Sequence, residues 1–208
     1  MANKTDFNLL LFNNFEALDA FGPADVISKL DELYQIKYFS ISGGLIRSAQ
    51  ESIIETLDSS KIRKNGILLI PGGIGTRTEA DDVEFIRILR DISEHSSYVL
   101  TVCTGTALLA RTGLLKGHNA TTNKLAFNWV IEQDKQVNWI KKARWVVDGK
   151  YYTSSGVSAG IDMTLGFISD KHGEEISRRI ARRIEYIWNS NKENDPFEDN
   201  AVVLGSSK

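Results

Sequence analysis

The strongest constraint on the fold is an alternation of short apolar runs with amphipathic stretches along the 208-residue chain. The apolar runs are typical of strands buried on both faces, and the amphipathic stretches carry apolar residues at helical spacing. Strands and helices that alternate in this way build a largely parallel sheet with crossover helices. We therefore predict an α/β fold in which helices sandwich a mostly parallel sheet. The predicted strands are residues 8–12, 34–42, 66–70 and 98–102.

Helices are predicted over residues 19–33, 81–96, 104–110, 125–133, 158–171 and 174–188. Residues 46–56 are expected to be extended but less regular. Asp148 and Gly149 stand between two β-rich runs, which predicts a small β-hairpin over residues 145–153. We expect one domain over residues 1–208, with a core over about 8–188 and a polar C-terminal tail from residue 189.

Charge and composition exclude several classes of protein. Twenty-five basic against 27 acidic side chains give a net charge of −2, so no net field favours a polyanion or an anionic membrane. The sequence therefore predicts no nucleic-acid partner. The N-terminus lacks a signal-like pattern, and no window of about 20 residues stays apolar, so we expect a cytoplasmic protein without a membrane segment. The single cysteine excludes an intrachain disulfide and fits a reducing compartment.

That cysteine, Cys103, follows a predicted strand and precedes a helix. Its sulfur would stand at the carboxyl edge of the sheet, where open α/β folds bind ligands. The turn would be a nucleophile elbow, with Gly105 relieving crowding behind it. The positive end of the following helix is expected to favour the thiolate. The alternative is a buried structural thiol.

Asp19 and the Pro71-Gly72-Gly73 segment follow two other predicted strands and are expected at the same edge. A carboxylate facing Cys103 would titrate together with it and could hold a proton for general acid catalysis. The alternative for Asp19 is a helix cap. The glycines could present backbone N–H groups to a developing negative charge, or form only a tight turn. The loop is not followed by Gly-Lys-Ser/Thr, so it is no phosphate loop of the Walker type.

The three histidines lie at no metal-ligand spacing from one another or from Cys103. They are His95, His118 and His172. We therefore predict no metal site. A Cys-His pair through His118 is a minor alternative.

Several segments together resemble the ThiJ/PfpI superfamily, which shares the class I glutamine amidotransferase-like, flavodoxin-like fold. They are EALDAFGPADV at 16–26, PGG at 71–73, VCTGTALLARTGLL at 102–115, ATTN at 120–123 and SGVSAGIDM at 155–163. The combination around Asp19 and Cys103 is most similar to isocyanide hydratases and to the sensor domains of AraC-type regulators. Those regulators carry two further helix-turn-helix units, and this sequence ends at Lys208 without them, which favours the enzyme.

The resemblance implies that Cys103 is the nucleophile, Asp19 its acidic partner and Thr104 the residue that follows the nucleophile. Gly72, Gly73 and Gly156 are expected to position the substrate. Protease-like members place histidine directly after the cysteine, so Thr104 weakens a proteolytic interpretation. Many relatives also have histidine where this chain has Asn123, which removes another possible base.

The implied activity is hydration of an organic isocyanide to an N-substituted formamide through a covalent thioimidate. It needs no metal or organic cofactor. The expected partners are a small-molecule substrate and a second copy in a homodimer. The alternatives are another thiol-dependent hydrolase or glyoxalase-like enzyme, and a non-enzymatic redox or small-ligand sensor.

Overall fold

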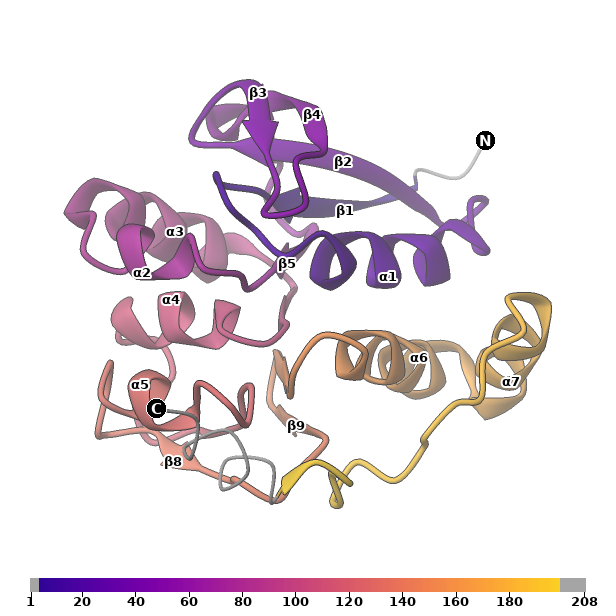
Figure 1. The fold of residues 1–208 in the computed structure, drawn as a ribbon. Coiled ribbons are helices and arrows are strands. Elements are labelled where there is room, and N and C mark those ends of the chain that lie inside the picture. Colours follow the sequence, from indigo (N-terminus) through magenta and orange to yellow (C-terminus); the bar gives the residue numbers. More distant parts are fainter. Residues whose placement is uncertain (1–3, 199–208) are drawn as a thin grey trace.

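The computed structural model describes residues 4–198 and contains an eight-stranded sheet with helices on both faces (Figure 1). The strand order is β3-β4-β2-β1-β5-β6-β10-β9, and neighbours are parallel except for the β3–β4 and β9–β10 pairs. The strands of this sheet are β1 Thr5–Leu10, β2 Tyr34–Ser40, β3 Ser42–Arg47, β4 Ile53–Asp58, β5 Ile67–Ile70, β6 Tyr98–Thr101, β9 Trp145–Asp148 and β10 Tyr151–Ser154. The predicted mostly parallel α/β fold is confirmed.

Helices α1, α6 and α7 lie on one side of the sheet, and α2, α3 and α4 lie on the other (Figure 1). The helices are α1 Ala17–Ser28, α2 Thr76–Glu79, α3 Val83–His95, α4 Gly105–Arg111, α5 Phe127–Ile131, α6 Ala159–His172 and α7 Glu174–Arg183, with a short 3₁₀ turn at Ser59–Lys61. A separate small sheet pairs β7 Asn119–Ala120 with β8 Asn138–Trp139.

The core is centred on β1 and β5, which lie in the middle of the sheet. Phe7 of β1 pairs with Ile36 of β2 and with Ile67 of β5, and all four residues of β5 are buried. Helices cover both faces, so these strands need apolar side chains in both directions, which explains their continuous hydrophobic sequence. This packing fixes the carboxyl ends of β1, β5 and β6 beside one another.

Several elements differ from the prediction. Residues 46–56 contribute to two regular strands, β3 and β4, and the one-turn helix α2 was not expected. The helix predicted over 125–133 is reduced to α5, and the last helix ends at Arg183 rather than at residue 188. Glu185 ends it because its φ of 53° is incompatible with a continuing helix. Ile187 is consequently 93% exposed instead of lying on the apolar face.

The first part of the tail predicted from residue 189 is anchored by buried charged side chains, and residues 199–208 of it lie outside the described residues. The Asp195 side chain is buried and accepts from Arg144 at 3.3 Å. Its second oxygen lies 3.7 Å from the Lys124 ammonium. Arg144 also forms a 2.8 Å ion pair with Asp162 of α6. The segment up to residue 198 is therefore part of the packed structure.

We expect Asp195→Ala to lower the free energy of unfolding by about 3 kcal/mol, because it leaves buried positive charge with less compensation. Urea unfolding at neutral pH measures this. Asp25→Ala removes an exposed ion pair with Lys29 and should cost less than about 1 kcal/mol. Equal losses in the two variants would show that the tail contact contributes nothing beyond a surface pair.

Candidate active site

Three segments that follow neighbouring parallel strands converge at the carboxyl edge of the sheet. They are residues 11–16 after β1, 71–75 after β5 and 102–104 after β6. The chain leaves β1 toward β2 on one side and later returns to β5 on the other, so the strand order reverses here. Such a switch point is the usual ligand site of an open α/β sheet. The Glu16 N–H donates to the Gly72 carbonyl at 2.8 Å and joins the first two segments.

Cys103 occupies the sharp turn between β6 and α4. Its φ of 57° lies in the left-handed region, which costs about 1–3 kcal/mol for such a residue. Two bonds hold the turn: the Cys103 N–H donates to the Ser155 carbonyl at 3.1 Å, and the Thr122 hydroxyl donates to the Cys103 carbonyl at 2.7 Å. Long-range contacts therefore fix the direction of the sulfur.

Two glycines allow the segments to approach this turn. A Cβ on Gly105 would lie 2.5 Å from the carbonyl oxygen of Ile70, which explains why the helix after Cys103 begins with glycine. A Cβ on Gly72 would lie 2.8 Å from Asp19 Oδ2 and 2.7 Å from the Thr104 nitrogen. At both glycines the neighbouring atoms are so close that a Cβ, and hence any side chain, would not fit.

Asp19 is completely buried in the first turn of α1 and does not cap that helix. Its Oδ2 accepts the Gly72 N–H at 2.9 Å, while Oδ1 has no hydrogen-bond partner among residues 4–198. Burial raises the pKa of Asp19 to about 7; the Gly72 bond opposes this rise, Glu16 adds to it, and the Cys103 thiol lowers the pKa slightly. Asp19 therefore exchanges its proton in the neutral range.

Burial also raises the pKa of the Cys103 thiol, and the charge of Asp19 raises it further. The backbone N–H groups of Thr104 and Val157 and the Thr104 hydroxyl act in the opposite direction and favour the charged sulfur. The N–H group of Thr104 at the start of α4 favours the thiolate, as expected, but desolvation and the charge of Asp19 outweigh it, so the pKa lies above its ordinary value. At neutral pH the site holds a thiol beside a carboxyl group that is partly ionised.

The backbone N–H groups of the two predicted positioning glycines already have acceptors. Gly72 donates to Asp19, and Gly73 donates to the Thr104 hydroxyl oxygen at 3.0 Å. These two N–H groups therefore orient the side chains of Asp19 and Thr104, and they are not free to bind negative charge that develops on a substrate. Thr104 is buried, and its hydroxyl oxygen also lies 3.2 Å from the Gly73 carbonyl oxygen.

Gly156 and Asn123 lie against each other beside the elbow. A Cβ on Gly156 would collide with Asn123 Nδ2, and the other amide atom, Oδ1, accepts the Ala126 N–H at 2.9 Å. A cavity of about 160 Å³ adjoins them and is also lined by Val157, Leu125 and other residues. The role of the Val157 N–H was not predicted, because a backbone donor leaves no signal in the residue type.

No histidine reaches Cys103. His118 lies 3.0 Å from Asp148 at the hairpin, whereas the opposite end of β10 is the one that approaches Cys103. The minor Cys-His alternative is therefore wrong.

Within residues 4–198, no cluster of three or more His, Cys, Asp or Glu side chains is arranged to hold a metal ion. Over the same residues, no helix has the length and apolarity needed to span a membrane.

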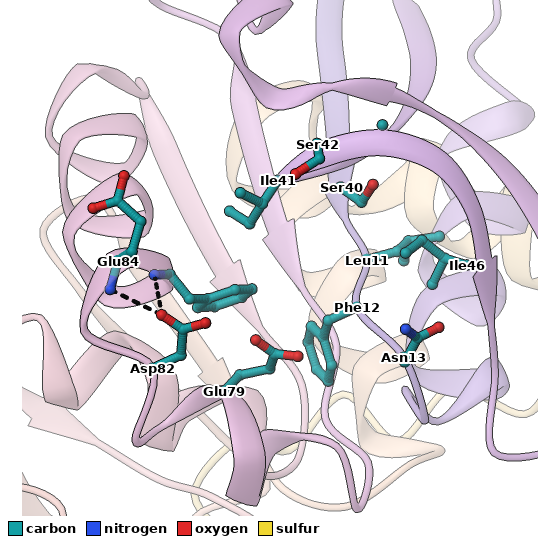
Figure 2. Close-up of a pocket in the computed structure, with 12 residues that line it drawn as sticks. Leu11, Phe12, Asn13, Ser40, Ile41, Ser42, Ile46, Glu79, Asp82 and Glu84 are labelled. Atoms are coloured by element: carbon teal, nitrogen blue, oxygen red, sulfur yellow. Dashed lines mark hydrogen bonds between the residues drawn. The ribbon is translucent and has the colours of Figure 1, made fainter.

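A larger cavity of about 270 Å³ lies between the β2–β3 region and α2–α3 (Figure 2). Apolar side chains such as Phe12 and Phe85 line it together with Glu79, Asp82 and Glu84. The Asp82 carboxylate accepts the backbone N–H groups of Glu84 and Phe85 at 2.9 and 3.0 Å, so it caps α3. Cys103 and Asp19 do not line this cavity, so it is separate from the candidate active site.

Residues 7–170 match the model of the DJ-1/PfpI family. The chain belongs to this family. The predicted resemblance to ThiJ/PfpI proteins is thereby confirmed. A solved ThiJ/PfpI family protein from Pseudomonas syringae superposes with a TM-score of 0.79 at 24% identity, over 88% of this chain and 76% of the other.

Among curated DJ-1/PfpI relatives, isonitrile hydratase of Pseudomonas putida is 27% identical over 177 residues. That match covers 85% of this chain and 76% of the hydratase. Isonitrile is another word for isocyanide, so the predicted relation to isocyanide hydratases holds at the level of the family.

The HTH-type transcriptional regulator GbdR of Pseudomonas aeruginosa is also similar, with 26% identity over 88% of this chain and 51% of the regulator. This similarity contradicts the prediction of no nucleic-acid partner, because the same domain occurs in transcriptional regulators. The prediction relied on the weak net charge and on the length of the sequence. The chain spans about half the length of the regulators it matches, so the length of this sequence does not distinguish an enzyme from a regulator.

We expect Asp19→Asn to accelerate alkylation of Cys103 by iodoacetamide about tenfold or more at pH 8. The amide keeps the shape but removes the negative charge that opposes the thiolate. Mass spectrometry gives an unambiguous readout because the chain has one cysteine. Asp25→Asn, on the exposed face of the same helix, is the matched control, and an equal rate in both variants would contradict the proposed coupling.

The stability contributed by protonated Asp19 should be lost as the pH rises from about 4 to about 7. The folded protein binds this proton more tightly than the unfolded chain, whose pKa is near 3.8, so the free energy of unfolding falls across that window by up to about 4 kcal/mol. Asp19→Asn should lack this contribution. Urea unfolding of both proteins at pH 4 and pH 8 measures it, and a pH-independent difference between them would refute it.

Proposed function

We propose that this protein hydrates an organic isocyanide to the N-substituted formamide, with Cys103 as nucleophile and Asp19 as proton carrier. One observation carries the proposal: a buried carboxyl group with a pKa of about 7 lies beside the only thiol of the chain, and its Oδ1 has no hydrogen-bond partner among residues 4–198. Proton transfer is most efficient when the catalytic pKa lies near the operating pH. The similarity to isonitrile hydratase names the substrate class.

The first step joins the thiol to the terminal carbon of the isocyanide. The Asp19 carboxylate takes the thiol proton at Oδ1 while the sulfur forms a bond to that carbon, and the same proton then moves to the carbon. The product is a thioimidate, Cys–S–CH=N–R, and Asp19 is again a carboxylate. Because Cys103 is otherwise a thiol, this proton transfer is needed to generate the nucleophile.

The second step returns the enzyme to its starting state. Asp19 removes a proton from water as the water oxygen adds to the imidate carbon, and the carbon–sulfur bond breaks. The thiolate recovers a proton from Asp19, and the released imidic acid rearranges to the formamide. The sum is addition of one water molecule to R–NC. The Thr104 and Val157 N–H groups stabilise negative charge on the sulfur during both steps.

The cavity beside Gly156 and Val157 offers room for the organic substituent of the substrate. Its volume of about 160 Å³ and the side chains of Leu125, Val157 and Phe197 suit a small alkyl or aryl group. The charged Lys124 and Arg144 that also line it are already engaged by Asp195. We therefore place uncharged substituents there.

A second candidate function is ligand sensing without turnover. The similarity to HTH-type transcriptional regulators favours it, because such a domain would bind a small molecule at this edge. Sensing by oxidation of Cys103 is less favourable, since a buried thiol with a raised pKa reacts slowly with oxidants.

Purified protein should convert cyclohexyl isocyanide to N-cyclohexylformamide, followed by proton NMR. Cys103→Ser and Asp19→Asn should each lower kcat/KM at least about a hundredfold, because each removes a required step. Asp25→Asn should retain the parent rate, since that side chain is exposed and remote.

Turnover that survives Cys103→Ser would contradict the mechanism. Absence of turnover in the parent, together with saturable binding of the isocyanide by calorimetry, would replace the hydratase by the sensing function.

A further inference from the structure

The segment that follows α7 contributes one wall of the cavity beside the catalytic turn. The chain returns from α7 to the loop between β8 and β9 (Figure 1). There the Arg144 N–H donates to the Lys192 carbonyl at 2.8 Å, and the Asp195 N–H donates to the Lys142 carbonyl at 2.7 Å. Phe197 follows this anchored stretch and lines the cavity of about 160 Å³. A side chain from the C-terminal part of the chain is thus brought to the cavity in which we place the substrate's substituent.

This cavity is joined to the catalytic turn through Ser155. Ser155 lines the cavity, and its carbonyl accepts the Cys103 N–H at 3.1 Å. The Ser155 N–H donates to the Arg144 carbonyl at 2.9 Å, which extends the pairing of β9 with β10 toward the turn. The same short stretch of sheet therefore supports both the turn that holds the sulfur and the C-terminal segment.

The solvent side of the cavity is formed by two apolar side chains. Lys124 and Arg144 also line the cavity, but both are buried and paired with Asp195. Leu125 and Phe197 are 59% and 50% exposed. These two side chains therefore lie between the cavity and the solvent, where a large substituent would have to extend.

Phe197 is held at this position by its backbone and by its ring. Its N–H donates to Asp195 Oδ1 at 3.2 Å, and Pro196 restricts the backbone between the two residues. The Asp195 carboxylate is fully buried and accepts from Arg144 at 3.3 Å. The Arg144 guanidinium carbon lies 5.8 Å from the centre of the Phe197 ring, which is within the range of a cation–π contact. The ring is thus a fixed wall of the cavity.

We infer that Phe197 determines the size of the organic substituent that the site accepts, and that Asp195 is the positioning residue that holds its ring. The inference rests on the proposed function, which places the substituent in this cavity. A compact group such as isopropyl fits inside the ring, whereas a bulky group such as adamantyl collides with it.

The first experiment compares kcat/KM for 1-adamantyl isocyanide with kcat/KM for isopropyl isocyanide. Phe197→Ala should raise this ratio at least about tenfold, because it removes the ring that limits the cavity. Phe197→Leu should give an intermediate ratio.

Leu33→Ala is the matched control and should keep the parent ratio. It truncates an apolar side chain of similar exposure, 45%, which directly precedes β2 at the opposite edge of the sheet. Equal changes in Leu33→Ala and Phe197→Ala would show a general loosening of the protein and would overturn the inference.

Asp195→Asn tests the anchor of the ring. The amide keeps the size of the side chain but removes the charge that binds Arg144, so the ratio should rise about threefold or more. In a Phe197→Ala background, the same substitution should change the ratio no further. Additive effects would show that Asp195 does not act through Phe197. If Asp195→Asn prevents folding, the two Phe197 variants still decide the role of the ring, because that side chain is half exposed.

A readout without turnover separates this inference from the proposed hydratase activity. Alkylation of the single cysteine by N-cyclohexylmaleimide and by N-methylmaleimide is followed by mass spectrometry. Phe197→Ala should raise the ratio of the cyclohexyl rate to the methyl rate about threefold or more, and Leu33→Ala should not. This result in a protein that turns over no isocyanide would refute the hydratase and support the size limit. Unchanged ratios in Phe197→Ala would overturn the inference, whether or not the parent is active.

Discussion

The site depends on the bond from the Gly72 N–H to the buried carboxylate of Asp19. This 2.9 Å contact orients one carboxyl oxygen and leaves the other buried, without a hydrogen-bond partner among residues 4–198. Without the Gly72 bond, burial would raise the pKa of Asp19 further. If the carboxyl group were fully exposed to water, it would be ionised at neutral pH. The balance of these two effects sets a proton affinity suited to neutral pH.

The rest of the arrangement supports this pair. The strained turn at Cys103 is held by Ser155 and Thr122, which come from distant parts of the chain. Glycines at 72 and 105 let the three segments approach without steric conflict. The central strands β1, β5 and β6 provide the rigid base, because their pairing fixes where each segment begins. Strain at the turn is thus sustained by the packing of the whole sheet.

Sequence reasoning located Cys103 and Asp19 at one edge because strand ends of a parallel sheet coincide there. It misjudged the ionisation of the thiol, since desolvation depends on packing that residue order does not reveal. It also missed Val157, whose backbone N–H opposes the rise in the pKa of the thiol. The last helix was overestimated because an apolar period continued past the turn at Glu185. The fold and the convergence of Cys103 and Asp19 could be predicted from the sequence, whereas the pKa shifts of the two groups depend on burial that only the structure shows.

The central claim is that Asp19 gains and loses its proton near neutral pH. The most direct test is a ¹³C NMR titration of the Asp19 carboxyl carbon in the folded protein, with Asp19→Asn used to assign the signal. The structure predicts a midpoint near pH 7. A midpoint near pH 4, the ordinary value for aspartate, would show a permanently ionised carboxylate and would contradict its role as proton carrier.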